Sequence, residues 1–209
     1  MKIIKKVNRI IVKRSFVTSQ YIRKYRLVRK RYLPELSREE FKQRLLRAKE
    51  YVQQCSEKDL DRIIEKEYKK RFKAYNSVDW YIGEVSNKEV GVWKKAGGLP
   101  LNWTRLSLAE TVNKVKQALK KDDKKVAKRA KRSIPRILDV IDLIEKEKYL
   151  YPIILPGGTM GRKKLKTMQG DIDDGCMRAI ALGLTGKKKF MVYIGFSKKK
   201  ESISSIKPK

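Results

Sequence analysis

The chain has 209 residues and a formal net charge of +31, from 54 lysines and arginines against 23 acidic residues. A folded protein with this excess repels itself unless a polyanion compensates the charge. Nucleic acid is therefore the expected partner, and an anionic membrane surface is the weaker alternative. The length suits one domain with extensions or two small domains, and a hydrophobic content of 41% is sufficient for a packed core.

Residue types that are absent or rare exclude several kinds of site. The chain has no histidine, which removes Ser-His-Asp triads, histidine general bases and nearly every zinc site, so we expect neither zinc nor haem. Two cysteines, Cys55 and Cys176, form no disulfide framework and indicate a reducing compartment. Apolar runs are too short for a membrane span, and cations interrupt those near the N-terminus. We expect an intracellular protein of the cytoplasm or nucleoid, with an organellar transit peptide as the alternative.

Residues 1–34 carry twelve lysines or arginines and no acidic residue. Aromatic side chains such as Phe16 and Tyr21 are interleaved with them, which suits a basic arm that follows phosphates while its rings stack or pack. The alternative is a disordered or weakly helical tail. The candidate nucleic-acid-binding residues of this arm are Arg23, Lys24, Arg26, Arg29, Lys30 and Arg31.

Residues 35–75 are predicted to form a helical extension. Ser37 with Glu40, and later Ser56 with Asp59, have the spacing of a pair that caps the first turn of a helix. The apolar residues that follow each pair recur at helical spacing, so we expect a helical hairpin or one broken helix. These apolar residues are Phe41, Leu45, Ala48, Val52 and Cys55, then Leu60, Ile63, Ile64, Tyr68 and Phe72. Cys55 is thus interpreted as a small buried residue.

From residue 76 the pattern changes to that of a mixed domain. Alternating apolar residues predict a strand from Val78, a glycine–proline loop follows over 94–103, and Ser107 with Glu110 begins another helix. This helix runs into a stretch, 114–136, with eleven basic and two acidic residues. The stretch is either a solvated helix face or a nucleic-acid contact through Lys125, Lys128, Arg129, Lys131 and Arg132. An apolar helix from Ser133 is predicted next, and then, over 149–158, a short buried strand that ends in a turn.

The segment 169–196 carries the candidate chemistry. We predict a tight turn over 171–175 in which Asp173 or Asp174 caps a helix from Cys176 to Leu184, followed by a strand over 190–196. The free N–H groups and dipole at the helix start would attract phosphate, and Arg178 would add a charged fork. Asp171 and Asp173 could hold Mg²⁺. The alternative is structural: the aspartates only cap the helix and pair with Arg178.

The stretch DGCMRAIALGLTGKKKFMVYIG, residues 174–195, resembles the hallmark segment of the ParB/sulfiredoxin-like superfamily, which reads Asp-Gly-x-His-Arg before a short helix and a strand. The order of the preceding elements agrees over about residues 76–197. The resemblance implies a small mixed-sheet core with Asp174, Arg178 and Asp173 as catalytic residues. It further implies a phosphate- or nucleotide-binding loop made of Gly175, Cys176, Met177 and Arg178.

Two departures from that family pattern bear on the chemistry. Met177 stands where the family has histidine, so chemistry that uses the histidine is not implied. Cys176 occupies the place of the sulfiredoxin cysteine, which raises a thiol-based enzyme as one interpretation and a small residue at a helix start as the other. The chain ends soon after the core, without the DNA-binding helices that follow it in chromosome-segregation members.

Together these observations predict an α/β (α+β) protein with a small mixed-sheet core and a helical, basic N-terminal extension. The expected division is a basic arm over 1–34, a helical extension over 35–75, the core over 76–197 and a disordered Lys/Ser tail over 198–209.

Three functions stay open. The first is an enzyme on nucleic acid, more DNA than RNA, that hydrolyses nucleotides, transfers phosphoryl groups, cleaves the polymer or modifies a base. It would use Mg²⁺ and a nucleoside triphosphate such as ATP or CTP. The second is a non-catalytic nucleic-acid-binding protein, and the third is the thiol-based enzyme. The basic composition also suits a phage or other mobile element.

Overall fold

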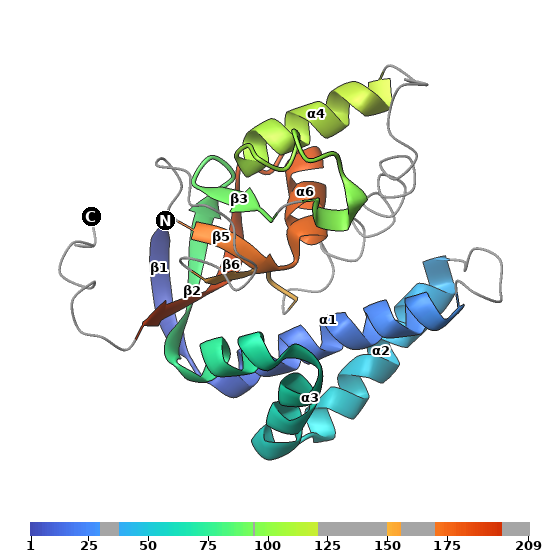
Figure 1. The fold of residues 1–209 in the computed structure, drawn as a ribbon, viewed down its shortest axis with the longest axis vertical. Helices are drawn as coiled ribbons and strands as arrows, with labels where there is room; N and C mark the ends of the chain where they lie inside the picture. The colour runs from blue at the N-terminus through green and yellow to red at the C-terminus, as the bar shows by residue number, and fades with distance from the viewer. Residues whose placement is uncertain (30–37, 94, 121–149, 156–169, 198–209) are drawn as a thin grey trace. The chain divides into compact units, whose positions relative to one another are not determined.

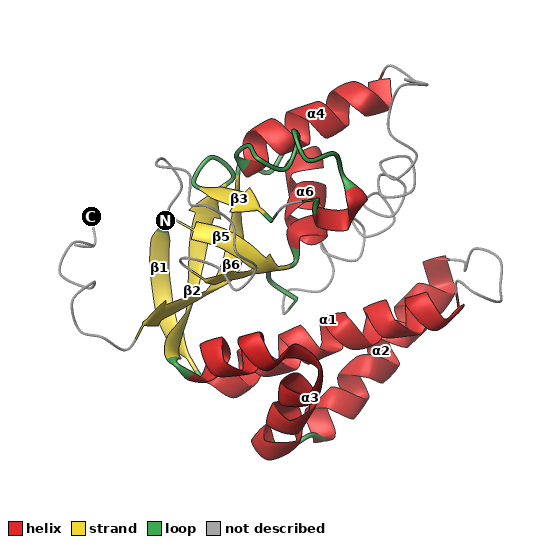
Figure 2. Ribbon diagram, in the orientation of Figure 1, coloured by secondary structure: helices red, strands yellow, loops and turns green. Residues whose placement is uncertain are grey.

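The computed structural model describes residues 1–29, 38–93, 95–120, 150–155 and 170–197. They form two compact units. The helical unit is Asn8–Asn76, and the sheet unit combines Met1–Val7 with the chain from Ser77 onward. Helices and one mixed six-stranded sheet make up these residues, which confirms the predicted α/β class (Figures 1 and 2). Within the described residues, no helix is long and apolar enough to cross a membrane.

The sheet has the strand order β1-β2-β6-β4-β5-β3. β1, β2 and β6 are antiparallel neighbours, β4 is parallel to β6 and antiparallel to β5, and β3 is parallel to β5. The two edges are therefore β1 and β3, while β4 and β5 lie inside the sheet. The strands are β1 Lys2–Val7, β2 Val78–Ser86, β3 Val90–Val92, β4 Ile153–Leu155, β5 Gly170–Asp174 and β6 Lys189–Ser197.

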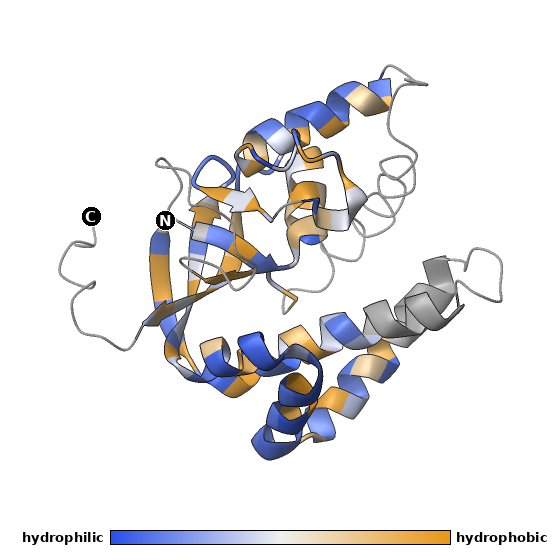
Figure 3. Cartoon of the chain, viewed as in Figure 1, coloured by the Kyte–Doolittle hydropathy of each residue, from blue (hydrophilic) through white to orange (hydrophobic). Residues whose placement is uncertain are grey.

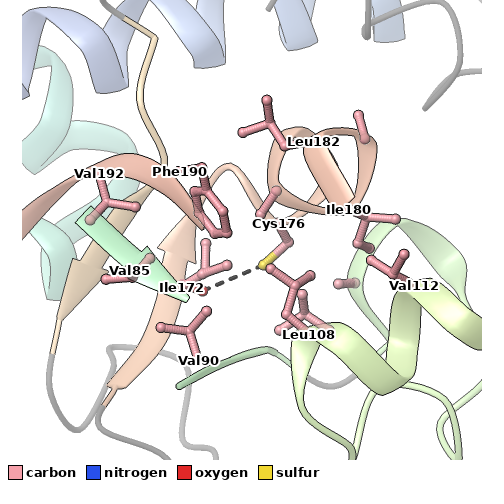
Figure 4. Packing of buried hydrophobic residues seen from close by; sticks show 14 of the residues in the cluster. Val85, Val90, Leu108, Val112, Ile172, Cys176, Ile180, Leu182, Phe190 and Val192 are labelled. Carbon is pink, nitrogen blue, oxygen red and sulfur yellow. Dashed lines mark hydrogen bonds between the residues drawn. The ribbon is translucent and has the colours of Figure 1, made fainter. Parts of the chain in front are cut away.

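Helices α4 (Leu108–Lys120) and α6 (Cys176–Leu184) and the short η1 turn (Ala96–Gly98) pack on one face of the sheet. Ile154, Ile172 and Ile194 come from three neighbouring strands and are fully buried in this core, part of which Figure 4 shows. Burying such a side chain stabilises the fold by about 1.5–3 kcal/mol. The core thus fixes β4, β5 and β6 beneath α6.

The predicted helix start at Ser107 is present, whereas those at Ser37 and Ser133 lie outside the described residues. The Ser107 amide donates to Glu110 Oε2 at 2.9 Å, and the Glu110 amide donates back to Ser107 Oγ at 3.3 Å, which caps the first turn of α4. Gly186 follows the end of α6 with φ +90°. Gly183 lies inside α6, where an added Cβ would stand 2.5 Å from a Val112 methyl carbon of α4. The glycine therefore permits the close approach of the two helices.

The helical unit contains α1 (Arg9–Arg29), α2 (Arg38–Gln54) and α3 (Glu57–Asn76), and hydrophilic residues cover most of α3 in Figure 3. The predicted apolar stripe is confirmed for Leu45, Ala48 and Val52 of α2 and for Cys55, which follows the helix, since all four are buried. The side chain of Phe41 lies outside the described part of the structure. The predicted pair Ser56 and Asp59 caps α3, with the Asp59 amide 3.2 Å from Ser56 Oγ. From α1, the buried Phe16 ring meets the edges of Tyr68 and Tyr75, each with centroids 5.3 Å away.

A buried lysine joins α1 to α3. Lys13 has no exposed surface, and its Nζ lies 2.9 Å from Glu57 Oε1 and 2.6 Å from Asp61 Oδ1. The hydrogen bond from Lys13 holds the pKa of the Glu57 carboxyl below its usual value, and Arg9 acts in the same direction. A buried cation is tolerated only when such partners compensate it. Acidic residues of α3 therefore have a structural role in this unit.

The structure divides residues 1–34 differently from the expected single basic arm. Residues 2–7 form edge strand β1 of the sheet unit, and residues 9–29 form α1 of the helical unit. Val12, Phe16 and Val17 are buried at helical spacing, so α1 is anchored by its apolar residues. The strand that pairs with β1 is β2, about seventy residues further along the chain. The charge composition of residues 1–34 holds no information about a strand partner at that distance. The expected tail over 198–209 lies outside the described residues.

Candidate functional site

The aspartates at 171, 173 and 174 lie in a strand. The sequence predicted a tight turn over 171–175, and this prediction is wrong because Gly170–Asp174 form β5. Hydrogen bonding to β4 on one side and β3 on the other satisfies the backbone of β5, and Ile172 is buried in the core. These interactions outweigh the low preference of aspartate for strands, which depends strongly on context. The aspartates are consequently buried side chains and not turn residues.

The strand register places the candidate residues on one face of the sheet. Ile153 of β4 is the partner of Asp174 on one side and of Tyr193 on the other. Paired residues point to the same face, so Asp174, Ile153 and Tyr193 share a row on the face opposite Ile172. The register shifts at Asp173, and Leu155 pairs with Asp171. The bulge thus ends β5 with a carboxylate beside the start of α6.

Gly175 makes the turn from β5 into α6. Its φ of +88° is in the left-handed region, and it occupies the position before the helix without any side-chain cap. The prediction that Asp173 or Asp174 caps α6 is therefore wrong. The first helical hydrogen bond runs from the Ala179 amide to the Gly175 carbonyl. A helix start that lacks a side-chain cap suits an anion, because its amide groups point outward and carry partial positive charge.

Arg178 lies across this turn and pairs with Asp174. Its Nη2 donates to Asp174 Oδ2 at 2.8 Å, and the two side chains are only 12% and 10% exposed. A Cβ added to Gly175 would stand 2.7 Å from Nη2 and 3.0 Å from Nε. The Nε atom is buried and has no hydrogen-bond acceptor within the described part of the chain. The predicted structural alternative, an ion pair, is thus present, and guanidinium donors remain at the turn beside it.

Two tyrosines border the same region. Tyr193 of β6 is 2% exposed, its ring centroid lies 5.4 Å from that of Tyr151, and its amide donates to the Pro152 carbonyl. Burial raises the pKa of Tyr193 to about 12, with Tyr151 acting in the same direction and the Arg178 charge opposing it. The Tyr193 hydroxyl is therefore a neutral group at ordinary pH. The sequence held no indication of this neighbour, because only the strand register brings it to Asp174.

Cys176 and Met177, the second and third residues of the resemblance motif's loop, have packing roles. Cys176 is 4% exposed, and its Sγ donates to the Ile172 carbonyl at 3.4 Å inside the core (Figure 4). This position favours a small core residue over a reactive thiol. Met177 packs against Gly97 of η1, where an added Cβ would stand 2.1 Å from the Met177 sulfur. The residue at the family's histidine position therefore contacts a tight turn whose glycine has φ +59°.

The remaining predicted sites are only partly within the described residues. Over those residues, no group of three or more His, Cys, Asp or Glu side chains is arranged to hold a metal ion. Mg²⁺ binding by Asp171 and Asp173 stays a prediction. Arg23, Lys24, Arg26 and Arg29 lie in α1. Outside the described residues lie Lys30, Arg31, Lys125, Lys128, Arg129, Lys131 and Arg132.

Comparisons with protein-family models, with curated proteins and with solved protein structures found no match. The ParB/sulfiredoxin-like resemblance therefore rests on the motif and the order of elements alone, and it stays a prediction.

The first prediction separates backbone strain from the Arg178 contact at Gly175. Gly175→Ala and Gly186→Ala both place a side chain at φ near +90°, but only the first meets the guanidinium, since nothing lies within 4 Å at Gly186. We expect Gly186→Ala to lower the free energy of unfolding by about 1–2 kcal/mol. Gly175→Ala should cost about 1–3 kcal/mol more through overpacking. Urea denaturation followed by tryptophan fluorescence reports on this unit, which holds Trp80, Trp93 and Trp103. Equal losses in the two variants would contradict the contact.

The second prediction follows from the raised pKa of Tyr193. The unfolded chain ionises this tyrosine near its ordinary value of 10.0 and the folded chain near 12. The stability that depends on a neutral Tyr193 is therefore present below pH 10 and is lost as the pH rises from 10 to 12. The full loss corresponds to about 2–3 kcal/mol. Urea denaturation at pH 9 and at pH 11.5 measures the decrease in the free energy of unfolding between the two. Tyr193→Phe should abolish the part of this decrease that comes from Tyr193. Tyr81→Phe, a partly exposed ring of β2, serves as the control, and an unchanged decline in Tyr193→Phe would refute the assignment.

Proposed function

We propose that this protein binds nucleic acid. The observation that carries the proposal is the spread of positive charge over both units. Residues 8–76 carry 21 lysines and arginines against nine acidic residues, and the rest of the chain carries 33 against 14. If the positive charge came from a basic tail on a neutral domain, only one of these two parts would have a large excess of basic residues. An excess in each of the two parts of the chain fits a polyanion as the partner.

The positions of the acidic side chains support the same proposal. Glu57 and Asp61 compensate the buried Lys13, and Asp174 pairs with Arg178. The capping residues Asp59 and Glu110 are bonded to serines at helix starts. Glu89 contacts the N-terminal ammonium group. Many carboxylates thus serve the fold, and phosphates of DNA, the more expected polymer, would compensate the exposed cations.

The third prediction tests nucleic-acid binding directly. Fluorescence anisotropy with a labelled 20-base-pair duplex and a 20-nucleotide single strand should show tight binding at 50 mM salt. The logarithm of the association constant should fall linearly with the logarithm of the salt concentration. The slope should be steeper than about −5, since each neutralised phosphate contributes about −0.9 on duplex DNA. Competition with polyglutamate of equal charge controls for general attraction to polyanions. No binding at 50 mM salt, or equal competition by polyglutamate, would refute the function.

A second candidate function is nucleotide-dependent chemistry at the β5–α6 turn, and the geometry of Arg178 favours it. Its guanidinium lies against Gly175 at a helix start without a side-chain cap, with Nε buried and without an acceptor in the described residues. A phosphate oxygen at this turn would accept from first-turn amides and from the guanidinium, while Asp174 would hold the guanidinium in place. The site would need no histidine, because phosphoryl transfer depends mainly on positioning and charge compensation.

Asp171 and Asp173 fit Mg²⁺ only in a site where the ion has few protein ligands. Mg²⁺ is commonly bound by one or two carboxylates together with water and substrate phosphates. Asp171 and Asp173 would supply these carboxylates from β5, and the ion would neutralise charge on the phosphates. Both residues are buried, so a bound nucleotide would have to expose them.

The fourth prediction concerns Arg178. Phosphate release from ATP and CTP, with Mg²⁺ and with or without duplex DNA, should fall about 100-fold or more in Arg178→Gln. Arg178→Lys should retain part of the activity, because it keeps the charge and loses the planar fork. Arg105→Gln, which removes an exposed arginine of the same unit, is the matched control and should resemble wild type. DNA affinity should stay unchanged in all three variants.

Two outcomes would contradict this second function. The absence of turnover in wild type, with salt-sensitive DNA binding intact, would leave the non-catalytic function alone. Equal losses of turnover and of DNA affinity in Arg178→Gln would show that the arginine supports the fold and not a nucleotide.

A further inference from the structure

The helical unit exposes a pair of aromatic rings. Tyr21 of α1 and Tyr51 of α2 are 42% and 46% exposed, and their ring centroids lie 5.1 Å apart with planes tilted by 41°. The two helices pack side by side within this unit (Figure 1). Phe16 and Tyr75, by contrast, have no exposed surface. The two expected roles of the N-terminal aromatics are thus divided: Phe16 packs, whereas Tyr21 presents its ring to solvent.

A depression of about 340 Å³ adjoins Tyr51, between the end of α2 and the start of α3. Its lining combines the ring with apolar, amide and charged groups: Gln54, Cys55, Asp59, Arg62 and Ile63. Such a lining offers an apolar contact for a flat ring and polar groups for its edge. The Arg14 guanidinium donates to the carbonyls of Gln53 and Cys55 at 3.1 and 3.3 Å, so α1 is tied to this end of α2.

Two arginines lie near Tyr51, and Asp59 lines the same depression. Arg47 is exposed one helical turn before Tyr51 and lies on the same face of α2, and Arg62 lines the depression. The helical unit as a whole has twelve more basic than acidic residues, 21 against nine. Charge complementarity thus favours a polyanion as the occupant, and the aromatic pair favours one with accessible flat rings. The neighbouring Tyr21 is the main cause that raises the pKa of Tyr51 above its ordinary value.

We propose that Tyr21 and Tyr51 form a stacking platform for the unpaired bases of single-stranded nucleic acid. The proposal rests on the proposed nucleic-acid binding and adds the form of the ligand. Every base has a flat face that can stack on tyrosine, so the platform would tolerate any sequence. Bases inside a duplex are already stacked on each other and cannot use it. The exposed arginines would bind the phosphates that join successive bases.

The experiment compares the full-length protein with Tyr51→Leu, Tyr21→Leu and Tyr51→Phe. Leucine keeps an apolar side chain without the aromatic face, and phenylalanine keeps the face without the hydroxyl. Leu46→Ala, which changes a 43% exposed side chain of the same helix, is the matched control. Anisotropy with labelled 20-nucleotide single strands and with the corresponding duplex gives both affinities at 100 and 300 mM salt. Circular dichroism confirms that each variant is folded.

We expect each leucine variant to weaken single-strand binding about tenfold, since one stacked base is worth about that factor or more. Duplex affinity and the salt slope should stay unchanged, and Tyr51→Phe and Leu46→Ala should resemble wild type. Single-strand binding that is equal in wild type and both leucine variants would overturn the platform while leaving the proposed function intact. Equal losses on duplex and single strand would also overturn it. If the wild-type protein binds neither the single strand nor the duplex, the proposed function itself is refuted.

Discussion

Negative charge is scarce in this chain, and its placement is the constraint on which both units depend. Basic residues outnumber acidic ones by 54 to 23. Lys13 can be fully buried only because two carboxylates of α3 reach its ammonium group. Arg178 can lie across the Gly175 turn because Asp174 ends the preceding strand. In each case one or two carboxylates allow a cation to be used inside the fold, where alone it would be expelled to solvent.

The same pairing explains why aspartates occupy β5. Neighbouring strands on both sides satisfy the backbone hydrogen bonds of β5. Each side chain of β5 can therefore suit the environment on its own face of the sheet. Ile172 fills the core face beneath α6, while the register directs Asp174 to the row that holds Ile153 and Tyr193. The carboxylate then meets the guanidinium four residues later in the chain. Strand, glycine turn and helix therefore form one local arrangement, in which the ion pair compensates the charges of two side chains that are each about nine-tenths buried.

Sequence patterns predicted the local elements well and the long-range ones poorly. The bounds of α6 were predicted as the structure has them, and the serine–acid pairs at Ser56 and Ser107 cap their helices, because these features depend on neighbours within four residues. β5 and β1 were missed because their stability comes from strands distant in the chain, and composition then favours a turn and a basic arm. Tyr193 was missed as a site neighbour for the same reason.

The two proposed kinds of surface contact respond differently to salt, and this difference would let the chain distinguish a single strand from a duplex. Cation–phosphate contacts weaken steeply as counterions compete, whereas stacking on an aromatic face depends little on ionic strength. At low salt the positive charge alone would hold duplex and single strand alike. Stacking on Tyr21 and Tyr51 would add to the binding free energy of a single strand at every salt concentration, so it favours the single strand over the duplex by a factor that salt changes little. Counterion release is also smaller on a single strand, about −0.7 per neutralised phosphate against about −0.9 on a duplex, so the preference for unpaired nucleic acid would increase further as the ionic strength rises.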